Sequence, residues 1–269
     1  LQRVEDLYRP YKQKKKTRAT EAKRKGLEPL AIWLKQPKLN ESIETKAAQF
    51  VNDEVKDVNT ALQGAQDIIA EMISDEPKYR KKILKDTYMA GQIVTQKKKN
   101  AEDEKEIFSM YYDYTEPIKK IANHRVLAVN RGEKEKILSV KIVIDTAGIE
   151  NYIRKYESQH EHEGAELINE AIKDSLKRLI MPSIEREIRG DLTEKAELHA
   201  IDVFSENLRN LLLQPPMQGK QILGVDPAFR TGCKLAVINP FGTFIAKGVM
   251  YPHPPINKKK LQKKYSFNL

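Results

Sequence analysis

Apolar residues recur every three or four positions along most of the first two hundred residues, which predicts a chain built mainly of α-helices. The clearest stripe of this kind consists of Leu62, Ala65, Ile68, Ile69, Met72 and Ile73. A second stripe consists of Ala165, Ile168, Ala171, Ile172, Leu176 and Leu179. Pro182 is expected to break this second helix. The sequence Asp-Leu-Thr-Glu at 191–194 has the acidic residues typical of a helix N-terminus. It is expected to begin another helix, which reaches about Leu213.

Shorter helices are expected on either side of the first stripe. One begins at Glu28, where Pro29 suits the first turn of a helix. Another covers 41–51. A third begins at Pro77 and is closed by Gly91. Together with the two long stripes, these segments predict a multi-helical region.

The residues between the two stripes give a weaker pattern. Residues 96–105 are polar and are expected to be exposed. Residues 124–135 could form a helix or a strand, whereas the Val- and Ile-rich run 137–145 predicts a strand. We therefore expect a helical region over 1–213 that includes one short β element near 137–145.

The pattern changes at 214–219, where two prolines and a glycine end the last helix and indicate a linker. The chain then alternates in the manner of β-strands, with a Pro-Phe-Gly turn between the second strand and the third. The expected strands are 221–225, 233–239 and 243–250. Three strands joined by short connections predict an antiparallel meander, which opens a second domain over 220–269.

The formal net charge of +10 is concentrated at the two ends of the sequence. The first 26 residues carry ten basic and three acidic side chains, and residues 248–269 carry five basic and no acidic ones. Positive segments of this kind neutralise phosphates, so a nucleic-acid partner is expected to bind at these ends.

The remaining composition narrows the class of protein. Hydrophobic residues make up 40% of the chain and charged residues 32%, which is typical of a globular protein rich in charged helices. No apolar run approaches the roughly 20 residues that a membrane span needs, so no membrane partner is expected. Cys233 is the only cysteine and cannot form an internal disulfide, which favours a reducing cytoplasm.

The basic segment near the beginning has two interpretations. Its lysines and arginines could neutralise phosphates while Tyr8 and Tyr11 stack on bases. Alternatively, the two tyrosines anchor the segment on the helical core and the charges are simply solvated. The candidate nucleic-acid-binding residues are Arg9, Lys12, Lys14, Lys15, Lys16 and Arg18.

Asp226 is the other chemically notable residue, because it ends the first expected strand of the second domain. In a two-metal phosphodiester hydrolase, a carboxylate on the first strand is a metal ligand. Arg230 and the backbone of Gly232 could meet a phosphate nearby. The alternative is that Asp226 only caps the turn before Pro227, because strand–Asp–turn sequences are common.

Several blocks, in order along the chain, resemble the Tex family of bacterial transcription accessory proteins. ILGVDP at 222–227 with RTGCK at 230–234 resembles the start of the family's YqgF/RNase H-like domain. GAQDIIAE at 64–71 and the block 179–189, which contains PSIERE at 182–187, are similar to blocks of its helical region. Further similar blocks are 5–8, 10–12, 17–19, 26–30, 124–125, 131–133 and 251–255. Ala228 departs from the pattern, since the family usually has glycine there.

The resemblance implies a mainly α fold, in which a Tex-like helical region precedes the first three antiparallel strands of an RNase H-like α/β domain. The family's helix-hairpin-helix modules and its C-terminal OB-type RNA-binding domain are not expected in 269 residues. The resemblance also implies a portion ahead of Leu1 and a remainder of the RNase H-like domain that the 269 residues do not contain, so a truncated chain is expected.

The expected function is that of a cytoplasmic, nucleic-acid-binding accessory factor for transcription. Its partners would be RNA or DNA and the transcription or translation machinery. No enzymatic activity, cofactor or metal is expected, because Asp226 alone cannot form a two-metal site. The run 160–163, His-Glu-His-Glu, lacks the spacing of helical zinc ligands. The alternatives are a helical protein–protein scaffold with solvated basic tails and an RNase H-like metal-dependent nuclease.

Overall fold

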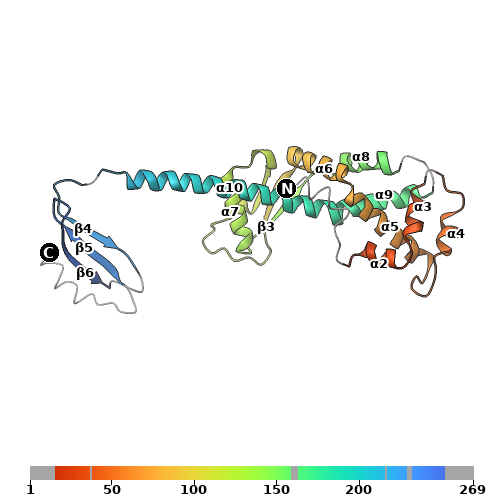
Figure 1. The fold of residues 1–269 in the computed structure, drawn as a ribbon, viewed down its shortest axis with the longest axis horizontal. Helices are drawn as coiled ribbons and strands as arrows, with labels where there is room; N and C mark the ends of the chain where they lie inside the picture. Colours follow the sequence, from red (N-terminus) through yellow and green to blue (C-terminus); the bar gives the residue numbers. More distant parts are fainter. Residues whose placement is uncertain (1–15, 37, 159–162, 216, 229–231, 252–269) are drawn as a thin grey trace. The chain divides into compact units, whose positions relative to one another are not determined.

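The computed structural model describes residues 16–251 apart from 37, 159–162, 216 and 229–231. The chain divides into two compact units, Leu1–Val203 and Phe204–Leu269, each described here by itself. Figure 1 shows the elements of both. In the part of the chain that the structure describes, no helix combines the length and the apolar character that crossing a bilayer demands.

Three short helices pack on the long helix α5 (Val58–Asp75) at the beginning of the first unit. They are α2 (Arg18–Arg24), α3 (Glu28–Leu34) and α4 (Ile43–Ala48). Pro29 lies in the first turn of α3, and the side chain of Asp57 accepts a hydrogen bond from the backbone N–H of Thr60 to cap α5. The helices predicted from Glu28, over 41–51 and along the stripe of α5 are confirmed, although α4 is shorter than the predicted 41–51, whereas α2 was not predicted.

A second group of helices follows. Helix α6 (Pro77–Ala90) ends at Gly91, as predicted. The next ones are α7 (Asn123–Lys134), α8 (Ala147–Glu157) and α9 (Ala165–Asp174). Residues 124–135, which the sequence left open between helix and strand, thus lie mainly in a helix.

The predicted break at Pro182 is wrong. Helix α9 continues through the wider π-type turns η4 (Ser175–Ile180) into α10 (Met181–Leu212). A proline inside a helix removes one N–H hydrogen bond and crowds the preceding turn, and π-type turns are among the local adjustments that accompany such positions. The helix start expected at 191–194 is also wrong, because these residues lie within α10, where Leu192 is buried against the core.

The first unit also contains a three-stranded antiparallel sheet, of which the sequence predicted only one strand. The strand predicted near 137–145 is β3 (Leu138–Val143), which pairs with β1 (Gln92–Lys97). Strand β1 also pairs with β2 (Asp113–Pro117), so the order is β2-β1-β3. Short 3₁₀ turns, η2 (Ser109–Tyr111) and η3 (Ile118–Lys120), flank β2.

Helix α7 packs closely on β3 at Gly132. A Cβ atom at this position would lie 2.6 Å from Cδ1 of Leu138 and 3.0 Å from Cδ1 of Phe108. Only glycine allows the helix to approach the strand so closely without displacing these side chains. Together, the helices and this sheet enclose one apolar cluster that extends from Ala19 to Ala196.

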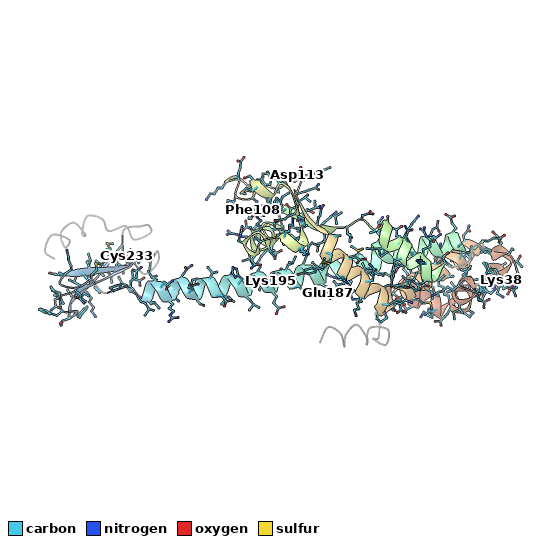
Figure 2. All side chains as sticks on the ribbon, turned by 90° about the horizontal axis from the view of Figure 1, so that it is seen from above. Lys38, Phe108, Asp113, Glu187, Lys195 and Cys233 are labelled. Carbon is cyan, nitrogen blue, oxygen red and sulfur yellow. The ribbon has the colours of Figure 1, made fainter. Side chains whose placement is uncertain are left out.

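A buried ion pair joins α6 to α10 inside the first unit. Arg80 pairs with Glu187, and their side chains are only 7% and 10% exposed. Nη1 of Arg80 also donates a hydrogen bond to Oγ of Ser183, 3.1 Å away. Figure 2 labels Glu187 on its helix. Buried charges are costly unless paired, so this contact fixes how the two helices align.

The second unit contains the predicted meander. Strands β4 (Ile222–Asp226), β5 (Cys233–Ile238) and β6 (Phe244–Met250) pair antiparallel in that order. In the turn between β5 and β6, Oδ1 of Asn239 accepts hydrogen bonds from the backbone N–H groups of Phe241 and Thr243, and Gly242 has a φ of 80°. The predicted fold class, a mainly helical region followed by three antiparallel strands, is confirmed.

Candidate nucleic-acid interface

Two of the predicted nucleic-acid-binding residues, Lys16 and Arg18, lie at the start of α2. The side chain of Lys16 is 84% exposed, and its Nζ lies 3.5 Å from Oε2 of Glu21. Arg18 is exposed in the first turn of the helix. The remaining candidates, Arg9, Lys12, Lys14, Lys15 and Arg230, lie outside the described residues, as do Tyr8 and Tyr11.

Thr17 fixes this end of α2 to α5. Its side chain accepts a hydrogen bond from the backbone N–H of Thr20, and the side chain of Thr20 accepts one from the backbone N–H of Thr17, which forms a capping box. Oγ1 of Thr17 also donates to Oε1 of Glu71 on α5, 3.0 Å away. The residue that follows Lys16 is therefore held in a defined position on the helical unit.

Arg18 also contributes to a charge network on α5, which the sequence did not predict. Asp67 is buried on α5, and this burial raises its pKa, while the positive charges of Arg178 and Arg18 act in the opposite direction. Nη2 of Arg178 lies 3.2 Å from Oδ1 of Asp67, and its Nε donates to Asp174. Asp67 is thus held mainly by Arg178, with Arg18 adding positive charge nearby.

Asp226 lies at the end of β4, as predicted, and is exposed. Its partner in the strand register is Lys234 on β5. In the part of the chain that the structure describes, His, Cys, Asp and Glu side chains form no group of three that could hold a metal ion. Asp226 therefore lies at the end of a strand, and no other carboxylates among the described residues join it to form a metal site.

The groove between α7 and α10 was not predicted from the sequence. It has a volume of about 680 Å³ and is lined by Asn130, Glu133, Glu185, Arg186, Arg189, Thr193, Glu194 and Glu197, among others. Across it, Nη1 and Nη2 of Arg189 donate to the two carboxylate oxygens of Glu133, at 3.1 and 2.6 Å. Nη2 of Arg189 also donates to Oδ1 of Asn130, and Nδ2 of Asn130 donates to Thr193.

These contacts join the 131–133 block to the 179–189 block, two segments in which the sequence resembles the Tex family. Oε1 of Glu185 accepts a hydrogen bond from the backbone N–H of Ile142 at the outer edge of β3. The groove thus ties helices and sheet together. Acidic side chains outnumber basic ones along it, so it is a poor place to bind phosphate.

Comparison with known families agrees with the order of these blocks. The family model described as "Tex central region-like" matches residues 38–204, which is more than half of the chain. The chain belongs to the Tex family. A second model of this family, described as "Tex protein YqgF-like domain", matches residues 220–268.

Relatives of this Tex-family chain are known from bacteria and from animals. It is 54% identical over 265 residues to "Uncharacterized protein YdcI" of Bacillus subtilis, covering 97% of this chain and 37% of that protein. It is 31% identical over 265 residues to "Transcriptional accessory protein Tex" of Neisseria gonorrhoeae, covering 94% and 34%. It is 32% identical over 271 residues to "S1 RNA-binding domain-containing protein 1" of Homo sapiens, covering 94% and 27%. The chain thus spans about a third of the length of these relatives.

Proposed function

We propose that the chain is the helical and YqgF-like part of a cytoplasmic, nucleic-acid-binding accessory factor for transcription. The match to the Tex family across both units carries this proposal. The names of two relatives, one a transcriptional accessory protein and the other an S1 RNA-binding domain protein, support it. The partners would be RNA or DNA and the transcription or translation machinery.

In this proposal, the basic segment that leads into α2 binds the nucleic acid. Support comes from Lys16, which is exposed directly ahead of the helix cap that Thr17 forms on α5. The net charge of +10 and the ten basic side chains among the first 26 residues also favour phosphate binding.

Binding of a fluorescent single strand across a salt series tests this proposal. If Lys14, Lys15 and Lys16 each contact a phosphate, replacing all three with glutamine should flatten the log–log salt slope by about 2 units for single strands. A matched control replaces three exposed lysines of another loop, Lys98, Lys99 and Lys105, with glutamine. If both variants give the slope of the unmodified protein, the lysines of the segment are only solvated and do not contact phosphate.

We further propose that Asp226 takes part in no phosphodiester hydrolysis. Two-metal hydrolysis needs several carboxylates that converge on the metals, and Asp226 stands exposed opposite Lys234. Incubation of labelled RNA and DNA with the protein and Mg²⁺ should therefore leave the strands intact. Cleavage that disappears in the variant Asp226→Ala would contradict this proposal and favour the nuclease alternative.

A second candidate function is a helical scaffold for other proteins. Leu198, Ile201 and Val203 are exposed on α10, which is unusual for large apolar side chains on one helix. A scaffold would show little salt-dependent affinity for RNA or DNA. The same salt series therefore separates the two functions.

A further inference from the structure

Four lysines form a row along one face of α6. Lys78, Lys81, Lys82 and Lys85 follow the spacing i, i+3, i+4 and i+7, which places them on a single stripe of the helix. At a rise of 1.5 Å per residue, the row extends over about 10 Å. The other face of α6 is turned inward, where Ile83 is buried.

Two tyrosines of α8 lie beside this row. Tyr152 and Tyr156 are four residues apart, with ring centroids 5.3 Å apart, and Tyr156 is 50% exposed. Nζ of Lys78 lies 4.8 Å from the ring centroid of Tyr156, and Nζ of Lys82 lies 5.7 Å from that of Tyr152. The lysines of α6 and the rings of α8 therefore belong to one surface, which we call the Lys–Tyr face.

A buried tyrosine fixes the two helices to each other beneath this face. The ring of Tyr79 on α6 contacts Tyr152 and Tyr156, with centroid separations of 6.1 and 6.3 Å. Its hydroxyl donates to Oε1 of Glu157 at 2.5 Å, and burial raises the pKa of Tyr79 well above its usual range. The Lys–Tyr face is thus built on a rigid support.

Two acidic groups near the Lys–Tyr face are already paired. Asp86 pairs with Lys82 at 2.5 Å, and Glu157 pairs with Lys35 at 2.7 Å. Lys81 and Lys85 are exposed and form no ion pair with any of the residues that the structure describes. This surface therefore keeps uncompensated positive charge next to accessible aromatic rings.

We propose that the Lys–Tyr face binds single-stranded nucleic acid, with lysines on the phosphates and a base stacked on Tyr156. This proposal rests on the nucleic-acid-binding function proposed above and adds a second contact, separate from the segment ahead of α2. The exposed tyrosine ring indicates which class of partner fits this surface. An acidic protein or a duplex would meet the lysines, whereas stacking on a half-exposed tyrosine requires an unpaired base.

The charge part of the proposal is tested by replacing Lys78, Lys81 and Lys85, the lysines of the row that pair with none of the described acidic residues, with glutamine in the 269-residue chain. Three lost phosphate contacts should flatten the salt slope for a fluorescent single strand by about 2 units. The variant at Lys98, Lys99 and Lys105 serves again as the charge-matched control. Fluorescence of Trp33, buried in α3, verifies that each variant is folded.

The stacking part is tested at Tyr156. Tyr156→Leu should weaken binding of the single strand by about fivefold or more, while Tyr156→Phe retains the ring and most of the affinity. Neither change removes a charge, so the salt slope should stay the same in both variants. Binding of a duplex should be almost unaffected by Tyr156→Leu.

The results distinguish failure of the Lys–Tyr face from failure of the proposed function. If the single strand binds and responds to the variant at Lys14, Lys15 and Lys16, but the α6 variant matches its control, then the Lys–Tyr face is no binding site and the proposed function stands. If Tyr156→Leu weakens duplex and single strand equally, selectivity for unpaired bases is wrong. If the unmodified chain shows no salt-dependent binding, both proposals fall.

Discussion

The two units of the chain differ in how they bury their side chains. The helical unit, Leu1–Val203, encloses an apolar cluster in which Leu30, Ile69 and Ile153 are fully buried. Among the described residues of the second unit, the buried hydrophobic side chains are Cys233 and Val237. The core residues of the first unit are thus held by packing on all sides, whereas strands β4–β6 are held mainly by backbone pairing and a specific turn.

The units differ in their polar contacts as well. The first unit contains an ion pair between Arg80 and Glu187 that is almost completely removed from solvent. In the second unit, the side-chain hydrogen bonds found among the described residues belong to the exposed turn at Asn239. Because unpaired groups cost most where water cannot reach them, we expect the stability of the chain to depend far more on the first unit.

The largest effect is expected at Glu187. Replacing it with alanine removes the carboxylate that pairs with the buried guanidinium of Arg80, which should lower the free energy of unfolding by about 3–5 kcal/mol. Denaturant unfolding followed by Trp33, the chain's single tryptophan, reports on this unit. Glu194→Ala, at an exposed position of the same helix, is the control. Equal midpoints for the two variants would show that the pair contributes little.

The next effect compares the two units directly. Ile69→Ala removes a fully buried side chain from the first unit and should lower the free energy of unfolding by about 2–5 kcal/mol. Val225→Ala removes a side chain that is 48% exposed in β4 and should change it by no more than about 0.5 kcal/mol. Trp33 fluorescence reports the unfolding midpoint of the Ile69 variant, whereas backbone hydrogen exchange in β4–β6 reports the opening of the second unit in the Val225 variant. A Val225 variant as unstable as the Ile69 variant would mean that the two units do not differ as described.

This contrast also explains which elements could be predicted from the sequence. Helix α5 could be predicted because one side of this long helix is buried, which gives an apolar stripe. Strands β4–β6 could be predicted because runs containing Val and Ile stand between turn residues. Strand β1 is harder to recognise, since its buried Thr95 is polar and depends on a hydrogen bond to the backbone carbonyl of Tyr111. Strand β2 contains no aliphatic residue and ends at Pro117, so only Tyr114 and Thr115 favour a strand there.

The candidate interfaces were predictable only in part. The basic segment is visible as a run of charge, and the lysines of α6 are visible by their helical spacing. Their pairing with Tyr152 and Tyr156 is not visible, because α6 and α8 are separated by a sheet and a helix and meet only in the folded chain. Whether Asp226 has any chemical role could not be decided from its strand position alone.

The smallest effect is expected at Asp67 and depends on pH. Burial raises the pKa of this carboxyl group, so the folded protein holds the proton more tightly than the unfolded chain does. Stability from this group is therefore complete below the pKa of the unfolded chain, about 3.9, and falls as the pH rises through the folded value. Asp67→Asn removes that loss, while Arg178 keeps Asp174 as its partner. The denaturant midpoint, followed by Trp33 fluorescence, is measured for this variant and for the unmodified chain. The variant's midpoint minus that of the unmodified chain should increase from pH 4 to pH 7. A fall over the same range would show that the attraction between Asp67 and Arg178 outweighs the cost of burying the charge.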